Sequence, residues 1–221
     1  MNYLLFTSFF ILTTPILAEG GKAIEKEWKK KGLVDVKKLI PKVIVDLKYS
    51  GKDNFLGEDM YGDLKNCYLQ KEVAYKLKKS YNYLQKIKKG YTFYIYDGAR
   101  PLRVQKFMWE KVKGTPQQPY VADPKNGSIH NFGSAIDLTL ADENGKELDM
   151  GTEFDFFGDL AEPRLESKLL KEGKLTLEQI KNRKLLREVM SISGFKVRPN
   201  EWWHFNAYGI REVKKKYGIL N

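Results

Sequence analysis

Residues 128–137 read SIHNFGSAID and place a histidine seven residues before an aspartate, with a glycine between them. The histidine, His130, is one of two in the 221-residue chain, and the other, His204, follows Glu201-Trp202-Trp203. Two histidines and one carboxylate supply the donors of a catalytic zinc site, which keeps a further position open for water. We therefore predict that His130, Asp137 and His204 surround one zinc ion.

This prediction requires the backbone to bend at both histidine-bearing stretches. Glu201 lies three residues before His204, which leaves its carboxylate free to act as a general base on water. On a regular strand, residues three or seven apart point to opposite faces. We therefore expect Glu201 on a bend before its strand and His130 on a loop before its strand, with 199–200 and 131–133 as the bends. Taken alone, either histidine could instead be a packed, hydrogen-bonded core residue.

The pattern of helices and strands favours an α+β fold. The elements mix without the repeated strand–helix–strand order of a parallel sheet, so we expect a single domain with a central, largely antiparallel sheet flanked by helices. Asn144-Gly145 predicts a hairpin turn, and Thr176 with Gln179 predicts a helix capping box. The expected strands are 43–49, 91–96, 135–140, 195–197 and 202–205, and the expected helices are parts of 22–40, 70–89, the residues after 101 through 112, 177–193 and a short basic helix at the C-terminus.

The N-terminal residues 1–18 are almost wholly apolar and end in the small residue Ala18. Their apolar run is shorter than the roughly twenty residues of a membrane span. We predict a signal peptide over 1–18, although the usual positive start is missing, and a single domain that carries the zinc site over 19–221. This prediction implies an exported protein, periplasmic or secreted, with no stable membrane insertion after cleavage; an uncleaved anchor is the alternative.

Composition limits the partners. The net charge is +11, and residues 1–18 contribute no Lys or Arg to it. Lysine runs such as 86–89 are typical of solvated helix faces, with attraction to an anionic wall or membrane surface as the alternative. We expect no nucleic-acid partner, and the sequence indicates no oligomeric state. Cys67 is the one cysteine, so it cannot form an intrachain disulfide, and we expect a small buried hydrophobe.

Several stretches of distinctive composition follow one another along residues 43–205. They are Lys48-Tyr49 followed by Asp53-Asn54-Phe55, Asp97-Gly98-Ala99-Arg100-Pro101, Ser128-x-His130, Gly133-Ser134-Ala135-Ile136-Asp137-Leu138-Thr139-Leu140 and Glu201-Trp202-Trp203-His204, accompanied by Phe154-Asp155-Phe156 and Asn182-Arg183. In this order they resemble the LAS metallopeptidases, and most closely the VanX-type D-alanyl-D-alanine dipeptidases of that group. Hedgehog signalling domains share the fold that this resemblance implies.

The resemblance also implies roles for individual residues. His130, Asp137 and His204 would bind zinc, and Glu201 would be the catalytic acid/base. Arg100 would stabilise the tetrahedral intermediate, because a fixed guanidinium aimed at the developing oxyanion favours the transition state over the ground state. From the residues alone, a surface salt bridge to the neighbouring aspartate at position 97 is the alternative for Arg100.

Three further residues match family positions near the substrate, namely Tyr49, Ser128 and Asp155. Each of them could instead be structural. The family usually has tyrosine where this chain has Ala99. That departure spares the catalytic groups but leaves the wall of the substrate pocket in question.

The resemblance implies zinc-dependent hydrolysis of free D-alanyl-D-alanine to two D-alanines. Because the predicted location is outside the inner membrane, turnover or salvage of wall dipeptide fits better than antibiotic resistance. The alternative is a D,D-carboxypeptidase or endopeptidase that acts on longer peptidoglycan peptides. A third hypothesis is a non-catalytic module with a structural metal, but such a site needs neither Glu201 nor Arg100.

Overall fold

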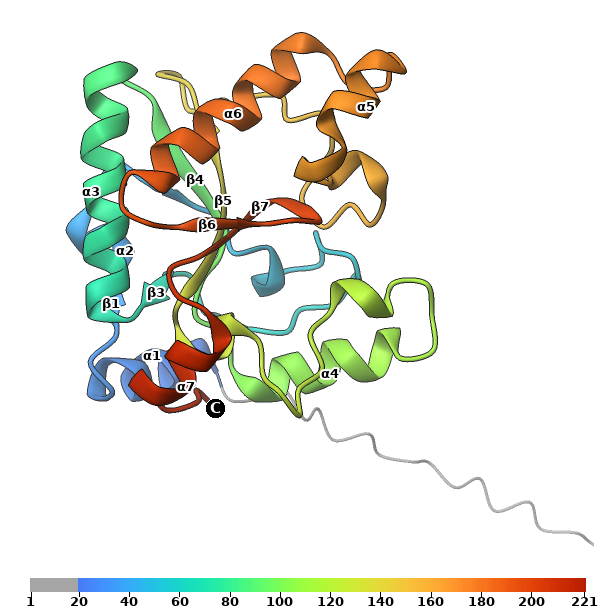
Figure 1. The fold of residues 1–221 in the computed structure, drawn as a ribbon. Coiled ribbons are helices and arrows are strands. Elements are labelled where there is room, and N and C mark those ends of the chain that lie inside the picture. Colours follow the sequence, from blue (N-terminus) through green and yellow to red (C-terminus); the bar gives the residue numbers. More distant parts are fainter. Residues whose placement is uncertain (1–19) are drawn as a thin grey trace, which may run out of the picture.

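The computed structural model describes residues 20–221, so the predicted signal segment lies outside the described residues. A five-stranded sheet stands at the centre of this part of the chain (Figure 1), in the order β2-β4-β5-β7-β6. Its first pair, β2 and β4, is parallel and the other neighbours are antiparallel, which confirms the largely antiparallel sheet. The strands are β2 (Ile44–Val45), β4 (Thr92–Asp97), β5 (Ala135–Ala141), β6 (Lys196–Arg198) and β7 (Glu201–Asn206), with β1 (Val34–Asp35) and β3 (Tyr68–Leu69) as a separate antiparallel pair.

Two long helices, α3 (Lys71–Ile87) and α6 (Leu177–Ser191), flank the sheet (Figure 1). The first packs against β4, the second against β5 and β6, and the helices also contact each other. Val73, Leu77 and Leu84 of α3 are fully buried, because their helical spacing places them on one face with lysines opposite. The other helices are α1 (Gly21–Lys30), α2 (Val36–Leu39), α4 (Leu102–Val112), α5 (Glu166–Lys171) and α7 (Ile210–Lys216), with short 3-10 turns η1 (Lys48–Ser50), η2 (Gln118–Tyr120), η3 (Ile129–Phe132), η4 (Asp159–Ala161) and η5 (Pro163–Leu165).

Local signals in the sequence fix the ends of several elements. The capping box is present at the start of α6, where Gln179 N donates to Thr176 Oγ1 at 3.2 Å and Thr176 N donates to Gln179 Oε1 at 2.8 Å. The Asn-Gly turn is also present, because Ala141 and Glu147 form a bridge across it. Both predictions from short motifs are therefore confirmed.

The predicted strand over 43–49 is wrong in its second half. The strand β2 ends at Val45, and the chain then turns through η1. The turn buries Tyr49, whose carbonyl accepts hydrogen bonds from the backbone of Met60 at 2.9 Å and Tyr61 at 3.0 Å. These contacts come from the loop that follows η1, outside the stretch 43–49, so the β-branched composition of that stretch could not reveal them.

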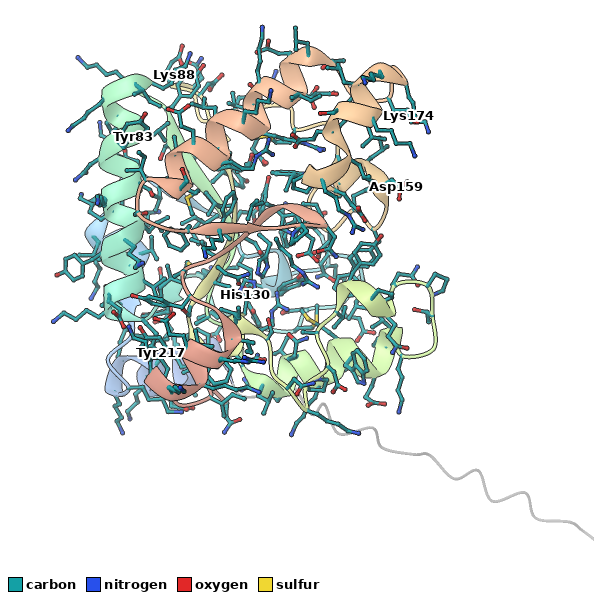
Figure 2. All side chains as sticks on the ribbon, in the orientation of Figure 1. Tyr83, Lys88, His130, Asp159, Lys174 and Tyr217 are labelled. Atoms are coloured by element: carbon teal, nitrogen blue, oxygen red, sulfur yellow. The ribbon has the colours of Figure 1, made fainter. Side chains whose placement is uncertain are left out.

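The described side chains separate into a packed interior and a charged periphery. Figure 2 shows His130 near the centre of the molecule and Lys88 and Lys174 at its edge. The thiol of Cys67 is buried in the main hydrophobic core, as expected, and burial raises its pKa well above the usual value. Within residues 20–221, no helix is long and apolar enough to cross a membrane.

Candidate metal centre and active site

The sheet register brings three polar residues side by side. Asp137 on β5 lies opposite Asp97 on β4 and opposite His204 on β7. Directly opposed residues of antiparallel strands project from the same face with about 4.5–5.5 Å between their Cβ atoms. The prediction that Asp137 and His204 meet is therefore confirmed, and the backbone pairing of β5 with β7 accounts for it.

A β-bulge places Asp97 in this row. The pairing of β4 with β5 moves from Ile95 opposite Leu138 to Asp97 opposite Asp137, so β4 carries one extra residue. Without the bulge, Asp97 would pair with Ile136 and point into the hydrophobic core. The bulge therefore turns its carboxylate toward the site, which is a common use of such irregularities.

The histidine of the first stretch reaches the site from η3, immediately before β5. Ser128 caps this turn: its Oγ accepts from His130 N at 3.4 Å, while its backbone N donates to Asn131 Oδ1 at 2.7 Å. Gly133 ends the turn with φ of +63°, a left-handed conformation that glycine adopts without strain. The expected loop position of His130, with a bend at Gly133, is confirmed.

The position expected for Glu201 needs a correction. Glu201 is the first residue of β7 rather than part of a preceding bend. The bend lies inside the strand, because β7 pairs with β5 only from His204 to Asn206 and its register with β6 shifts near Arg198. Glu201 Oε2 consequently lies 3.6 Å from His204 Nδ1, although the two residues are three positions apart.

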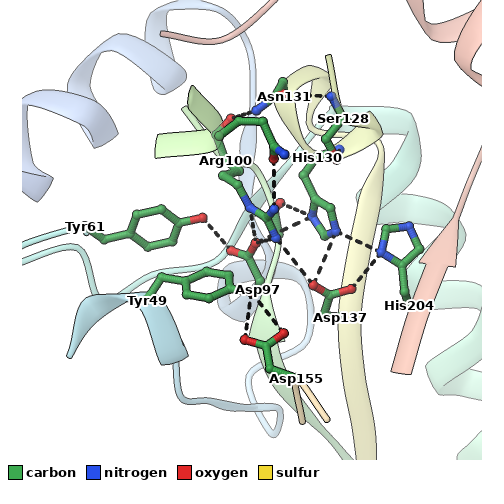
Figure 3. A network of polar contacts seen from close by, with 12 residues as sticks. Tyr49, Tyr61, Asp97, Arg100, Ser128, His130, Asn131, Asp137, Asp155 and His204 are labelled. Carbon is green, nitrogen blue, oxygen red and sulfur yellow. Dashed lines mark hydrogen bonds and ion pairs between the residues drawn. The ribbon is translucent and has the colours of Figure 1, made fainter. Parts of the chain in front are cut away.

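The three predicted metal donors converge on one point (Figure 3). His130 Nε2 lies 3.3 Å from Asp137 Oδ2, and His204 Nδ1 lies 3.1 Å from Asp137 Oδ1. The two histidine nitrogens are 3.2 Å apart. Ligand atoms about 2.0–2.1 Å from a tetrahedral zinc ion lie about 3.3 Å from one another, so these separations fit a zinc coordination shell.

Hydrogen bonds on the far side of each ring show why a cation fits between them. His130 Nδ1 donates to the carbonyl of Gly98 at 2.7 Å, and His204 Nε2 donates to Asn206 Oδ1 at 2.9 Å. When the rings are neutral, as metal binding requires, each presents a lone pair at its other nitrogen. Two such lone pairs and a carboxylate would repel one another. Asp137 Oδ1 is also buried without a hydrogen-bond donor within residues 20–221, and a metal ion would give this oxygen a positive partner.

The pKa values of Asp137 and Glu201 are shifted in opposite directions. Burial acts to raise the pKa of Asp137, but His130 and His204 outweigh it and hold that pKa far below its usual value. Burial raises the pKa of Glu201, and the positive charge of Arg198, 3.2 Å away, acts against the rise. Asp137 therefore stays ionised, as a metal ligand must, whereas Glu201 is suited to gain and release a proton.

The guanidinium of Arg100 is held from two sides. Its Nε and Nη2 donate to Asp97 Oδ2 at 3.0 and 2.8 Å, and its Nη1 donates to Gln105 Oε1 at 3.0 Å. The group also lies over the ring of Tyr49 and 3.7 Å from Asp137 Oδ2. The predicted alternative, a pair with Asp97, is thus present, but it is buried and fixes Arg100 beside the metal donors.

Sequence reasoning missed two residues that support the Arg100–Asp97 pair, Tyr61 and Gln105. Tyr61 donates to the second oxygen of Asp97 at 2.7 Å, and Gln105 donates onward to the carbonyl of Ala122 at 2.8 Å. Tyr61 lies 36 positions from its partner. The one available signal was that Asp97 belongs to the same short motif as Arg100.

All eight predicted site residues line one narrow cavity of about 30 Å³. Its remaining wall was not predicted as part of the site and is mostly aromatic, with Phe55, Tyr120, Val121, Phe157, Arg198 and Trp203. The ring of Phe157 stacks on Tyr120 at 4.9 Å and meets Phe55 at 5.0 Å, so three segments that are distant in the sequence meet in this wall. A larger cavity of about 790 Å³ shares Phe55 and Asp155 with it but contains none of the predicted metal donors.

Two of the predicted substrate residues contact each other. The hydroxyl of Tyr49 donates to the two oxygens of Asp155 at 3.2 and 3.0 Å. Burial, followed by the negative charge of Asp137, raises the pKa of Asp155 well above its usual value. Asp155 also has φ of +59°, and it is the one non-glycine residue with positive φ in residues 20–221.

Ala99 packs into the hydrophobic core and does not line the cavity, so the loss of tyrosine there leaves the described wall intact.

Comparisons with known proteins show the family to which the chain belongs. Residues 29–218 match the M15 peptidase family described as D-Ala-D-Ala dipeptidase. The chain is 37% identical to a D-alanyl-D-alanine dipeptidase of Escherichia coli (strain K12) over 78% of this chain and 83% of the relative. It is 30% identical to a D-alanyl-D-alanine dipeptidase of Enterococcus faecium over 72% of this chain and 83% of the relative.

Two solved structures are more distant. The LdcB LD-carboxypeptidase aligns with a TM-score of 0.41 and 23% identity over 67% of this chain and 63% of that chain. The vancomycin-resistance D,D-pentapeptidase VanY in complex with Zn(II) aligns with a TM-score of 0.33 and 17% identity over 68% of this chain and 79% of that chain. From the sequence match over residues 29–218, the protein belongs to the D-Ala-D-Ala dipeptidase family of M15 peptidases, a family of zinc metallopeptidases.

Proposed function

We propose that this protein hydrolyses free D-alanyl-D-alanine to two D-alanines with one zinc ion per chain. The observation that carries the proposal is the composition of the 30 Å³ cavity. It combines three converging metal donors, a buried carboxylate beside them, a fixed guanidinium and a second buried carboxylate. A structural metal site needs only the first of these features, so the arrangement favours a hydrolytic enzyme over a binding module.

The residues of the chain divide the reaction between them. His130, Asp137 and His204 would hold the zinc ion, which when bound polarises the peptide carbonyl and favours ionisation of water. Glu201 takes a proton from the attacking water and delivers it to the leaving amine, as its burial beside the donors allows. The guanidinium of Arg100 stabilises the negative charge that develops on the carbonyl oxygen.

The size of the cavity favours a short substrate. A volume of about 30 Å³ holds only about two water molecules, by the size of a single-water cavity. We infer that the aromatic wall formed by Phe55, Tyr120 and Phe157 moves outward to admit a dipeptide and encloses it on return, so that a longer peptide would hold this wall open.

Asp155 is placed to recognise the amino group of the substrate. It lies in the cavity wall with a hydrogen bond from neutral Tyr49, and an ammonium group would complete the charge balance of this buried carboxylate. Ser128 lies at another part of the same wall and would contact the substrate there. Recognition of a free amine distinguishes a dipeptidase from an enzyme that cleaves longer chains.

Steady-state kinetics on three substrates test the proposal. D-alanyl-D-alanine is compared with N-acetyl-D-alanyl-D-alanine, which lacks the charged amine, and with a tripeptide that ends in D-alanyl-D-alanine. We expect kcat/KM to be highest for the free dipeptide. Faster cleavage of the tripeptide would overturn the assignment in favour of the second candidate, a D,D-carboxypeptidase or endopeptidase of peptidoglycan peptides.

We further propose an exported enzyme, periplasmic or secreted, that acts in the turnover or salvage of wall dipeptide. This proposal is supported by the apolar residues 1–18 of the sequence. Fractionation of cells that express the full chain should place the activity outside the inner membrane. Activity confined to the cytoplasmic fraction would contradict the proposed location.

A further inference from the structure

The sequence pair Asn182-Arg183 accompanies the catalytic motifs, but the proposed reaction gives it no role. Arg183 lies on α6 with its side chain fully buried. This burial lowers the pKa of the guanidinium to about 10. The burial of an arginine that takes no part in the reaction needs an explanation, because charged side chains are seldom buried unless they are paired or hydrogen-bonded.

The guanidinium of Arg183 joins the two ends of one loop. Its Nε donates to the carbonyl of Met150 at 2.6 Å, and its Nη2 donates to the carbonyl of Leu160 at 2.8 Å. These carbonyls lie ten residues apart in the chain, at either side of the loop 149–161. The planar fork of arginine suits this use, because its donors point in fixed and different directions.

Neighbouring side chains hold the same loop at its start. Asn182 Nδ2 donates to the carbonyl of Asp149 at 2.9 Å, and Gln179 Nε2 donates to its carboxylate at 2.9 Å. Trp202, which lies 5.8 Å from the guanidinium, donates to Thr152 Oγ1 at 2.7 Å. The loop is therefore tied to α6 and to β7, the strand that carries Glu201 and His204.

The middle of the loop carries the groups that face the substrate. In the sequence, Asp155 lies midway between Met150 and Leu160, the residues whose carbonyls bind Arg183. It is the one non-glycine residue with a positive φ in the described chain. Such a conformation persists only where the surrounding structure enforces it. Phe154 contacts the ring of Tyr49, and Phe157 forms part of the aromatic wall.

Ion pairing alone does not explain Arg183. Its nearest carboxylate, Glu166, is 3.8 Å away from Nη1. Both oxygens of Glu166 already accept hydrogen bonds from Arg187, at 2.7 and 2.6 Å. The short contacts of Arg183 go to the loop carbonyls instead.

We propose that Arg183 is a positioning residue. It binds the backbone at both ends of the loop 149–161 and so holds Asp155 at the place where Asp155 binds the amino group of the substrate. The proposal rests on the proposed dipeptidase function. It predicts that a change at Arg183 alters recognition of the free amine more than the chemical step.

The test compares the zinc-loaded full chain with Arg183→Lys and Arg183→Met. Lysine keeps a charge but has one nitrogen for two separated carbonyls. Arg187→Met is the matched control, because Arg187 lies one turn further along α6 and binds Glu166 rather than the loop. Asn182→Ala is a milder second variant that removes one contact at the start of the loop.

Three quantities are measured: amide hydrogen exchange over 149–161, zinc content, and kcat and KM for D-alanyl-D-alanine and its N-acetyl form. In both Arg183 variants we expect faster exchange in the loop and a rise in KM of about tenfold to a hundredfold, the scale of a misplaced binding group. The preference for the free amine should shrink, kcat should change by less than KM, and zinc content should stay at the wild-type level. Asn182→Ala should show the same changes more weakly.

The positioning role would be overturned if Arg183→Lys had the same loop exchange and the same KM as the wild type or as the Arg187→Met control. If the Arg183 variants do not fold, loop exchange in Asn182→Ala that equals the wild-type rate would also overturn the positioning role. A wild-type protein that does not hydrolyse D-alanyl-D-alanine would overturn the proposed function, and the recognition role with it. The two failures are separate, because loop exchange is measured without substrate.

Discussion

Replacement of Arg100 by lysine keeps the positive charge at the proposed active site but removes the planar guanidinium, and so tests whether the geometry of that group matters. The guanidinium makes two contacts with Asp97 Oδ2 and one with Gln105 Oε1, on opposite edges of the group. A lysine ammonium retains the positive charge but has one nitrogen, so it cannot satisfy both partners and also face the reacting carbonyl. Loss of a single oxyanion-stabilising contact costs about 2.7–4 kcal/mol. We therefore expect kcat to fall about 100–1000-fold in Arg100→Lys.

The same substitution should cost a measurable amount of stability. Asp97 is fully buried, and its Oδ2 would lose one of two charged hydrogen bonds while Tyr61 continues to donate to Oδ1. A hydrogen bond to a charged group contributes about 1.5–3 kcal/mol, so the free energy of unfolding should fall by about that amount. The protein remains folded in this case, which allows turnover to be compared.

The assay measures D-alanine release, zinc content and urea unfolding for the wild type, Arg100→Lys and the control Arg164→Lys. Arg164 is largely exposed and pairs with Glu162 away from the cavity. The control should retain wild-type turnover, and both variants should retain zinc. A kcat for Arg100→Lys within about threefold of the wild type would refute the role of the guanidinium.

Three further substitutions give distinct results. Glu201→Gln should retain zinc and lose about a hundredfold or more in kcat, because the amide cannot accept the proton; normal turnover with bound zinc would remove Glu201 from the mechanism. Asp155→Asn should raise KM and, in the free protein, raise the thermal stability at pH 7. Equal melting temperatures at pH 7 would contradict the second effect. Gly98→Ala should lower the free energy of unfolding by about 1–3 kcal/mol, since its Cβ would lie 2.5 Å from Cys67 Sγ; wild-type stability in urea would show that this approach is not tight.

The pH dependence of the Asp155 effect follows from linkage. The unfolded chain ionises this carboxyl near pH 4, whereas burial raises its pKa in the folded protein. Between these two values the folded state binds more protons, so the wild-type protein loses stability as pH rises. Asparagine has no such ionisation and accepts the positive φ of this position. The stability gained by Asp155→Asn should therefore disappear as the pH is lowered below about 4.

The sequence was most informative where a local pattern controls the structure. The alternation of β5 places Asp137 on the other face of the strand from the core residues Ile136 and Leu138, and the bend after His130 was predicted at 131–133, whereas the cap by Ser128 was not predicted. The stretch at 201–204 was paired with 128–137 from the donor types alone, and the resemblance to a known family added Arg100, Tyr49, Ser128 and Asp155. All the predicted site residues consequently line the same cavity.

The remaining features depend on contacts between distant segments. The bulge of β4 is visible only in the pairing of β4 with β5. No pattern within residues 92–97 indicates that Asp97 turns toward the site. The same limit applies to the bend inside β7 that sets Glu201. Arg183 lay in a recognisable motif, but its contacts with the carbonyls of Met150 and Leu160 follow from packing of α6 against a loop.

Zinc stoichiometry measured together with D-alanyl-D-alanine hydrolysis tests the central claim most directly. The purified protein is analysed for metal, treated with a chelator, assayed, and assayed again after zinc is restored. We predict one zinc ion per chain, loss of hydrolysis on removal, and recovery on addition, with no zinc retained by His204→Ala. Full hydrolysis by the metal-free protein, or a zinc-loaded protein without dipeptidase activity, would contradict the account.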